Sequence, residues 1–365
     1  MTPPPPHLFT LSPEELADLA RSQGQRLPLG QARRLLVHVL SEGQDDLDLP
    51  GQPLSRATTA WLREHLRHDR LQVVQRVCDP GDGSVRYLLR SPDGALHEAV
   101  RIPLHKPGAF SVCLSSQVGC AMGCTFCATG RLGLTRHLEA WEMVAAWRLV
   151  RDEVVTQGLG RVTGAVFMGQ GEPFHNYDAV IRAAQVLGHP CGGRINGRAI
   201  TISTVGLVPQ IRRYTAEGHR FRLIVSLTSA RAEQRAALLP VAGRFSLDEL
   251  AQALRAHHQA TRQRVTVAMV VLGGVNTGED EVQALRALLG DLPVRINLVD
   301  VNEARQGPDS FRRATEAERR AFMDGLATLG QPVVRRYSVG QEQQAACGML
   351  AATQGTAPGA ASADV

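Results

Sequence analysis

The chain has 365 residues, of which 44% are hydrophobic and 21% are charged, so it can bury a large core and is not globally disordered. Its 40 basic and 35 acidic side chains give a net charge of +5, which permits a polyanionic partner without requiring one. No run approaches the roughly 18 apolar residues of a membrane helix, and the first ten residues lack the features of a signal peptide. We therefore expect a soluble, cytoplasmic protein.

The N-terminal region predicts a small helical domain. Residues 1–10 are proline-rich and are expected to be disordered. Ser12-Pro13-Glu14-Glu15 forms a capping box at the start of a helix. Further helices are predicted at 31–42 and at about 55–68. Together they define an accessory domain over residues 11–70.

From residue 71 the hydrophobic period changes to that of strands. Segments 71–78, 85–90 and 96–102 predict short strands, and Asp82-Gly83 and Asp93-Gly94 predict the turns between them. These strands form a β extension over residues 71–105.

Beyond the extension, strands and helices alternate. Strands are predicted at 110–115, 165–168, 199–203, 223–227, 265–272 and 294–299, and helices at 138–156, 177–187, 207–217, 246–258, 279–289 and 315–328. Six βα units in series predict an α/β fold, a partial barrel of parallel strands within residues 106–350. Reactive groups in such folds lie at the carboxyl ends of the strands. The tail 351–365 is expected to be flexible.

Three of the seven cysteines crowd one loop after the first barrel strand, Cys120-Ala-Met-Gly-Cys124-Thr-Phe-Cys127. A structural zinc ion requires four protein ligands. No second cysteine pair follows this loop, although His137 could supply a fourth ligand. A cubane iron–sulfur cluster takes one thiolate per iron, so three thiolates leave one iron open. An open position is what a catalytic metal centre needs. A cluster is favoured, and zinc is the alternative.

This C-x3-C-x2-C spacing within a βα series resembles the radical S-adenosylmethionine (SAM) superfamily. The resemblance implies a [4Fe-4S] cluster on the three cysteines, with SAM chelated by the fourth iron. It also implies that Gly171 and Glu172, within Met168-Gly-Gln-Gly-Glu-Pro173, contact the amine of SAM. A glycine permits close backbone approach and a carboxylate accepts from an ammonium group, whereas Gly-Glu-Pro alone is usually an ordinary turn.

Further motifs resemble the RlmN/Cfr family of radical SAM RNA methyltransferases, in the same order over about residues 70–350. They are Glu98-Ala-Val-Arg-Ile-Pro103, Ser111-Val-Cys113-Leu-Ser-Ser-Gln-Val-Gly-Cys120, Cys127-Ala-Thr-Gly130, Ile202-Ser-Thr-Val-Gly-Leu-Val-Pro209, Asn297-Leu-Val-Asp-Val-Asn302 and Ala345-Ala-Cys347-Gly348. The family implies methylation of a ring carbon of adenosine, carbon 2 in preference to carbon 8. The implied substrate is 23S ribosomal RNA, with transfer RNA as a further candidate.

The family chemistry implies roles for two distant cysteines and one carboxylate. Cys347 takes a methyl group from one SAM, and a second SAM provides the radical that activates this S-methylcysteine to attack the ring. Glu98 is the proton acceptor, and Cys113 releases the product by forming a transient disulfide with Cys347. Taken singly, each residue has a simpler interpretation. Cys113 could be a buried inert cysteine, Cys347 could only fill the core, and Glu98 could be a solvated strand residue. The family also implies an electron donor such as flavodoxin or ferredoxin.

The same resemblance implies SAM contacts from Ser203, Ser226, Leu227, Thr228 and Asn302, although a strand-end Ser or Asn is often only a turn or a cap. The chain departs from the family at Thr228, where His is common, and in the accessory domain. The alternatives are a radical SAM enzyme for a different RNA, a small molecule or a protein, and a zinc-binding RNA adaptor. The arginine-rich stretches 63–70 and 335–336 could bind phosphates or be solvated surface. We expect a monomer that does not contact membranes.

Overall fold

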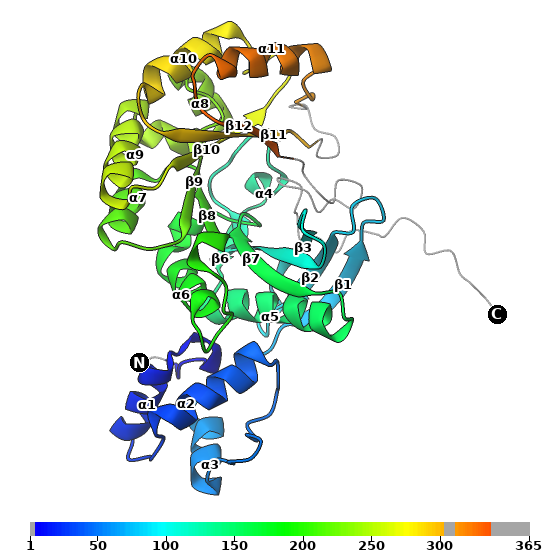
Figure 1. The fold of residues 1–365 in the computed structure, drawn as a ribbon, viewed down its shortest axis with the longest axis vertical. Coiled ribbons are helices and arrows are strands. Elements are labelled where there is room, and N and C mark those ends of the chain that lie inside the picture. Colours follow the sequence, from blue (N-terminus) through cyan, green and yellow to red (C-terminus); the bar gives the residue numbers. More distant parts are fainter. Residues whose placement is uncertain (1–3, 303–310, 337–365) are drawn as a thin grey trace, which may run out of the picture.

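The accessory domain consists of three helices at one end of the molecule (Figure 1). The computed structural model describes residues 4–302 and 311–336. Helix α1 (Pro13–Ser22) begins with the predicted capping box, in which Ser12 and Glu15 each bond the other's backbone N–H. Helix α2 (Leu29–Leu36) continues as a π-helical turn (Val37–Ser41), and α3 is Arg56–His65. The predicted helices of this region are confirmed.

The expectation that residues 1–10 are disordered is wrong for the described part of that segment. Leu8–Thr10 form a 3₁₀ turn in which Leu8 and Phe9 are buried. The His7 ring stacks on Trp141, with centroids 4.7 Å apart. Apolar side chains at these positions find a complete packing site, and this outweighs the proline-rich composition that suggested disorder.

One ten-stranded sheet runs through the described part of the chain in the order β1-β2-β3-β4-β7-β8-β9-β10-β11-β12. The strands are β1 (Gln72–Cys78), β2 (Val85–Arg90), β3 (Leu96–Pro103), β4 (Ala109–Leu114), β7 (Arg161–Phe167), β8 (Ile200–Thr204), β9 (Arg222–Ser226), β10 (Val265–Val271), β11 (Val294–Asp300) and β12 (Val333–Arg336). Strands β1 to β4 pair antiparallel, and β4 to β12 pair parallel. The predicted β extension is therefore hydrogen-bonded directly to the first barrel strand.

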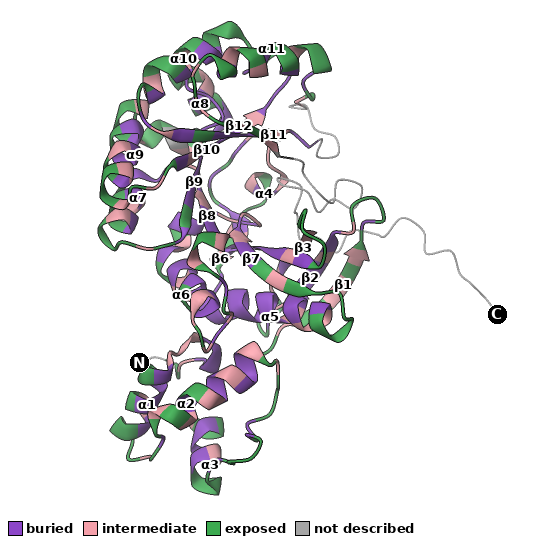
Figure 2. Cartoon of the chain, in the orientation of Figure 1, coloured by how far each residue is buried: buried purple, intermediate pink, exposed green. Residues whose placement is uncertain are grey.

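Helices follow the strands and cover the outside of the curved sheet (Figure 1). They are α5 (Ala140–Thr156), α6 (Tyr177–Gly188), α7 (Val208–Ala216), α9 (Leu247–Thr261), α10 (Glu279–Leu289) and α11 (Glu316–Ala327). All six were predicted. Helix α5 is buried along most of its length, as Figure 2 shows. It lies between the sheet and the accessory domain, so its polar side chains need internal partners.

Five short elements at the barrel mouth and the sheet edge were not predicted. They are the hairpin β5 (Gln117–Cys120) and β6 (Gly133–His137), the short helices α4 (Ala128–Arg131) and α8 (Ala232–Leu238), and the edge strand β12. Each is seven residues or shorter, which is too short for a periodic pattern to stand out. Three of them flank the cysteine loop or the strand ends around it.

The accessory domain is attached to α5 and α6 by arginines. Arg148 Nη2 donates to Gly43 O at 2.7 Å, and Arg151 Nη2 donates to Leu40 O at 2.6 Å. Arg67 forms an ion pair with Glu139 at 2.8 Å, and Arg182 donates to Thr10 O at 2.5 Å. We call these contacts the accessory seam. Within the described ranges, no helix is long and apolar enough to cross a membrane.

Candidate functional site

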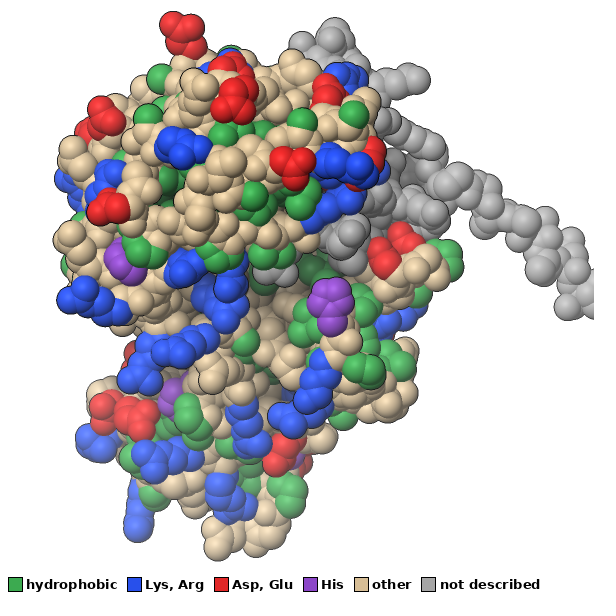
Figure 3. Space-filling view, turned by 45° about the horizontal axis from the view of Figure 1, so that its top comes forward, with side chains coloured by type: hydrophobic (Ala, Val, Ile, Leu, Met, Phe, Trp, Pro, Cys, Tyr) green, Lys and Arg blue, Asp and Glu red, His purple; other side chains and the backbone are tan. Residues whose placement is uncertain are grey.

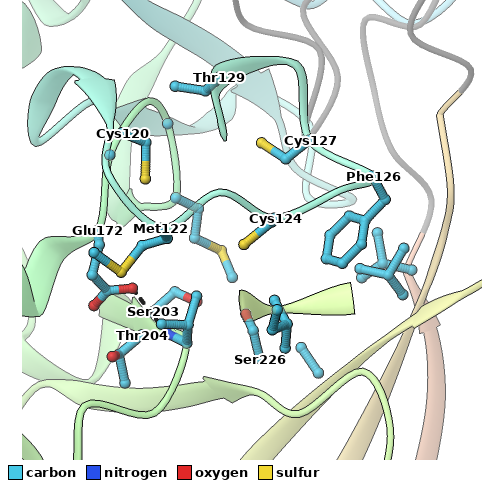
Figure 4. A pocket seen from close by; sticks show the side chains of 18 of the residues that line it. Cys120, Met122, Cys124, Phe126, Cys127, Thr129, Glu172, Ser203, Thr204 and Ser226 are labelled. Atoms are coloured by element: carbon cyan, nitrogen blue, oxygen red, sulfur yellow. Dashed lines mark hydrogen bonds between the residues drawn. The ribbon is translucent and has the colours of Figure 1, made fainter. Parts of the chain in front are cut away.

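A pocket opens at the carboxyl ends of strands β7 to β11 and contains a cavity of about 190 Å³. Its wall includes the cysteine loop on one side and the strand ends on the other (Figure 4). Eight of the predicted site residues line it: Cys120, Cys124, Cys127, Gly171, Glu172, Ser203, Ser226 and Asn302. Segments from residue 120 to residue 302 are thus brought together at one end of the parallel strands, where such folds place their reactive groups.

The cysteine loop runs from the end of β5 to the start of α4. Figure 4 shows the sulfurs of Cys120, Cys124 and Cys127 pointing toward the same space. The loop is tight, since Cys127 N donates to Cys124 O at 3.1 Å. Gly130 closes it, because a Cβ there would lie 2.9 Å from Cys124 O. The local spacing therefore produces three thiols on one wall of the cavity.

Burial keeps the thiols of Cys120 and Cys124 protonated in the absence of a ligand. It raises the pKa of Cys120 to about 12 and also raises that of Cys124, where Cys127, Cys120 and Glu172 add to the effect. Binding a metal reverses this balance, because coordinated thiols lose their protons. Among the described residues, no three Cys, His, Asp or Glu side chains are grouped tightly enough for a single metal ion. Three thiols arranged around a cavity match three corners of a cubane cluster.

Glu172 is held opposite the thiols by backbone donors. Its two carboxylate oxygens accept from Phe174 N and Val205 N, each at 2.9 Å. Gly171 adopts a φ of +97°, and a Cβ there would lie 2.6 Å from Gln117 Cβ. Burial raises the pKa of Glu172 to about 7. Among the described residues, no cationic side chain pairs with this carboxylate, so it is suited to a cationic ligand.

Glu98 lies beside the pocket, on β3, and its side chain is fully buried. Its carboxylate accepts from Arg86 Nη1 at 2.6 Å and from Gln170 Nε2 at 3.2 Å. The interpretation of Glu98 as a solvated strand residue is therefore wrong. Gln170 belongs to the same loop as Gly171 and Glu172, so hydrogen bonds connect Glu98 to the pocket wall.

Cys113 lies on the same face of the β3–β4 pair. The register places Cys113 opposite Val100, and side chains two residues apart on a strand share a face, so Glu98 is on this face as well. Cys113 is buried with Val100 against Val166 and Met168. Met168 lines the cavity, so one side chain separates Cys113 from it. Neither Glu98 nor Cys113 is itself part of the cavity wall.

Leu227 and Thr228 are two further predicted site residues that are not in the pocket wall. Both are buried just beyond Ser226. Thr228 has a φ of +58°, which is unusual for a β-branched residue, and its buried hydroxyl has no hydrogen-bond partner among the residues that the structure describes. Asn276 Nδ2 holds its carbonyl at 2.7 Å. Cys347 lies outside the described residues.

Sequence reasoning missed the partners of the predicted residues. Arg86 and Gln170 bond Glu98, and Thr204 supports Glu172. Gln170 lies within the motif Met168-Gly-Gln-Gly-Glu-Pro173, so the sequence could have indicated it as a residue of the site. Arg86 could have been found only from the register, which places Leu88 opposite Glu98 and Arg86 diagonally from it.

Two other predictions change with the structure. His137, the alternative fourth ligand, is exposed and bonds Gln117 Nε2 at 2.9 Å instead of lining the cavity. The arginine-rich stretches are partly neutralised: Arg67 pairs with Asp69 and Glu139, Arg70 with Asp45, and Arg335 with Asp300. These three arginines already have carboxylate partners, so they are poor candidates for phosphate binding.

Known proteins resemble this chain over most of its length. The model of the radical SAM superfamily matches residues 114–288. The chain is 49% identical over 336 residues to a protein of Anaeromyxobacter sp. (strain Fw109-5) named "Probable RNA methyltransferase", covering 88% of this chain and 97% of that protein. It is 36% identical over 343 residues to the dual-specificity RNA methyltransferase RlmN of Syntrophotalea carbinolica, covering 94% and 88%.

A solved structure has the same fold. The crystal structure of a radical SAM methyltransferase from Sphaerobacter thermophilus superposes with a TM-score of 0.87 at 35% identity. The match covers 96% of this chain and 100% of that chain. The similarity therefore includes the accessory domain and the sheet as well as the cysteine loop.

Proposed function

This chain belongs to the RlmN/Cfr family of radical SAM RNA methyltransferases, and we propose that it methylates carbon 2 of an adenosine in 23S ribosomal RNA. The observation that supports this most directly is the pocket in which three cysteines and Glu172 meet at the ends of parallel strands. One relative is named a dual-specificity RNA methyltransferase, which supports transfer RNA as a second substrate. Carbon 8 is the second candidate position on the ring.

Cys120, Cys124 and Cys127 would hold a [4Fe-4S] cluster, since three thiols on one wall match a cubane with one open iron. When bound, the cluster supplies the electron for reductive cleavage of SAM. The chain shields Cys120 and Cys124 from solvent, since both side chains are buried. Burial strengthens the electrostatic contacts inside the pocket.

The opposite wall would bind SAM. Glu172 accepts a hydrogen bond from the ammonium group, and Phe174 N and Val205 N fix the direction of its carboxylate. Ser203, Ser226 and Asn302 offer hydroxyl and amide groups around the cavity. An ammonium partner lowers the pKa of the buried Glu172 and keeps it ionised.

Glu98 and Cys113 would act on the RNA side of the pocket. Arg86 and Gln170 fix the Glu98 carboxylate from two directions, which orients it as the acceptor of the ring proton. Cys347 carries the methyl group taken from the first of two SAM molecules used per turnover. Cys113 then forms a disulfide with Cys347 and frees the methylated RNA.

The RNA is expected to extend beyond the pocket. Basic side chains gather on the lower part of the face in Figure 3, which includes the accessory domain. Basic surface of this kind attracts phosphates without reading sequence. We further propose that the enzyme is a cytoplasmic monomer and that a flavodoxin or a ferredoxin supplies its electrons.

The test is an anaerobic reaction of the reconstituted enzyme with methyl-labelled SAM and total RNA, followed by nucleoside mass spectrometry. We expect labelled 2-methyladenosine in ribosomal RNA. The Cys347→Ala variant should lose methyl transfer but still cleave SAM. Label only on carbon 8 would correct the position, and the absence of carbon-methylated adenosine from every RNA would refute the proposal.

A further inference from the structure

Arg235 on α8 carries a buried positive charge that no carboxylate neutralises in the part of the chain that the structure describes. The residue is only 4% exposed. Its guanidinium donates to the backbone carbonyls of Ser226 at 3.0 Å, Leu227, and Val205 at 2.6 Å. Neighbouring Arg231, by contrast, pairs with Asp280 and Glu281. Arg235 therefore differs from Arg231, the N-cap residue of the same helix.

The charge lies directly behind the pocket wall. Val205 and Ser226, two of its carbonyl partners, line the cavity. Burial lowers the pKa of Arg235 to about 10, and the nearby Cys124, when ionised, opposes that change. The guanidinium therefore remains charged at neutral pH, and the thiol of Cys124 close to it is neutral until a metal removes its proton.

Helix α8 also holds the cysteine loop itself. Leu238 O, at the end of α8, accepts from Thr125 N at 3.1 Å. Thr125 stands between Cys124 and Cys127 in the loop. One short helix thus carries the buried cation and anchors the segment that bears two of the thiols.

A buried charge without a counter-ion is costly. Three carbonyl dipoles offset part of that cost, and an anionic occupant of the pocket would offset much of the rest. A cubane bound by three thiolates is net negative and becomes more so on reduction. Net charge and hydrogen bonding near a cluster are among the factors that set its reduction potential.

We propose that Arg235 is a positioning residue that compensates the negative charge of the thiolate-bound cluster and so makes the cluster easier to reduce. This rests on the proposed binding of a cluster by the three cysteines, and not on which RNA is methylated. Arg235 also ties the ends of β8 and β9 to α8 through Val205 O and Ser226 O, and Leu238 O at the end of that helix holds the cysteine loop through Thr125 N.

The test compares Arg235→Met and Arg235→Gln, which remove the charge, with Arg235→Lys, which keeps it. Arg286→Met on α10 is the control, because Arg286 is exposed and bonds only Thr328 in the described chain. Each protein is reconstituted anaerobically, assayed for iron and sulfide, and titrated potentiometrically with detection by electron paramagnetic resonance. Melting of each metal-free protein reports on structure alone.

We expect both neutral variants to make reduction of the cluster about tenfold less favourable, a fall of ~59 mV for one electron. The Lys and Arg286 variants should stay close to the wild type. Unchanged potentials in fully loaded neutral variants would overturn the proposal. So would failure of both neutral variants to fold without metal, which would assign Arg235 a purely structural role. Wild-type protein that takes up no iron would instead refute the cluster, and with it the proposed function.

Discussion

The accessory seam and the cysteine pocket treat buried charge in opposite ways. At the seam, Arg148 pairs with Asp45 and with Asp152 at 3.3 Å, and its guanidinium lies over the Phe9 ring at 5.3 Å. At the pocket, Glu172 and Arg235 are both buried, but the partners that hold them are backbone groups and a Thr hydroxyl. The charged side chains of the seam are paired with one another, whereas Glu172 and Arg235 at the pocket have no ionic partner in the described ranges of the chain.

This difference distinguishes two kinds of charged side chain: those of the seam, which stabilise the fold, and those of the pocket, which are available to a ligand. An arginine with a carboxylate partner has little left to offer to a third group. A buried charge held only by backbone dipoles costs folding energy, and a ligand can repay that cost. Four changes would break or sharpen this comparison.

The largest effect is expected from Cys124→Ala. Loss of one of three thiolate ligands should prevent stable cluster binding and reduce SAM cleavage and RNA methylation at least ~1000-fold. Iron content and visible absorption after anaerobic reconstitution provide the measurement. Cys191→Ala is the matched control, since Cys191 is partly buried but outside this pocket. Full iron loading of the Cys124 variant would show that the pocket is not the cluster site.

Glu172→Gln should weaken SAM binding about 10- to 100-fold, because a charge-assisted hydrogen bond contributes roughly 1.5–3 kcal/mol. Equilibrium dialysis of labelled SAM against the reconstituted variant measures this. Cluster content should remain normal, since Glu172 is opposite the thiols. Unchanged SAM affinity would mean that the buried carboxylate has a structural role, like those of the seam.

Arg148→Met should destabilise the protein by about 2 kcal/mol, because it leaves Gly43 O without its donor and leaves the Asp45 carboxylate with Arg70 alone. Urea unfolding of the metal-free protein gives the value. Exposed Arg63→Met on α3 is the control and should change stability by less than ~0.5 kcal/mol. If both variants unfold at the same urea concentration, the ion pairs of the seam do not stabilise the docked domain.

The smallest effect concerns pH at the seam. Burial lowers the pKa of His7 from 6.5 to about 4, so between these values the unfolded chain binds a proton that the folded chain does not. The contribution of His7 to the free energy of unfolding is therefore complete above about pH 6.5. It is lost as the pH falls toward 4, by at most ~1.4 kcal/mol per pH unit. His7→Phe should make the free energy of unfolding, measured in urea, less dependent on pH over this range, even if the variant is less stable at every pH. An unaltered slope would show that other groups cause the acid sensitivity.

The sequence predicted the features that depend on short segments. The capping box at Ser12, the strands β1–β4 and β7–β11, the cysteine loop and the Gly171-Glu172 turn are encoded by neighbouring residues, and the structure places them as expected. The contacts of Arg86 and Arg235 depend on strand register and on a seven-residue helix. Such contacts require tertiary structure, because no local period marks them. Leu8 and Phe9 were misjudged for the same reason, since their packing site is on a distant helix.

The anchoring of residues 7–9 beneath α5 has a practical consequence for shortening or tagging the chain. A version starting at residue 11 would discard two buried apolar side chains and the imidazole that stacks on Trp141. It would expose that indole and uncover the guanidinium of Arg148. Affinity tags are better placed before the prolines at the N-terminus, where they leave the packing of His7, Leu8 and Phe9 undisturbed.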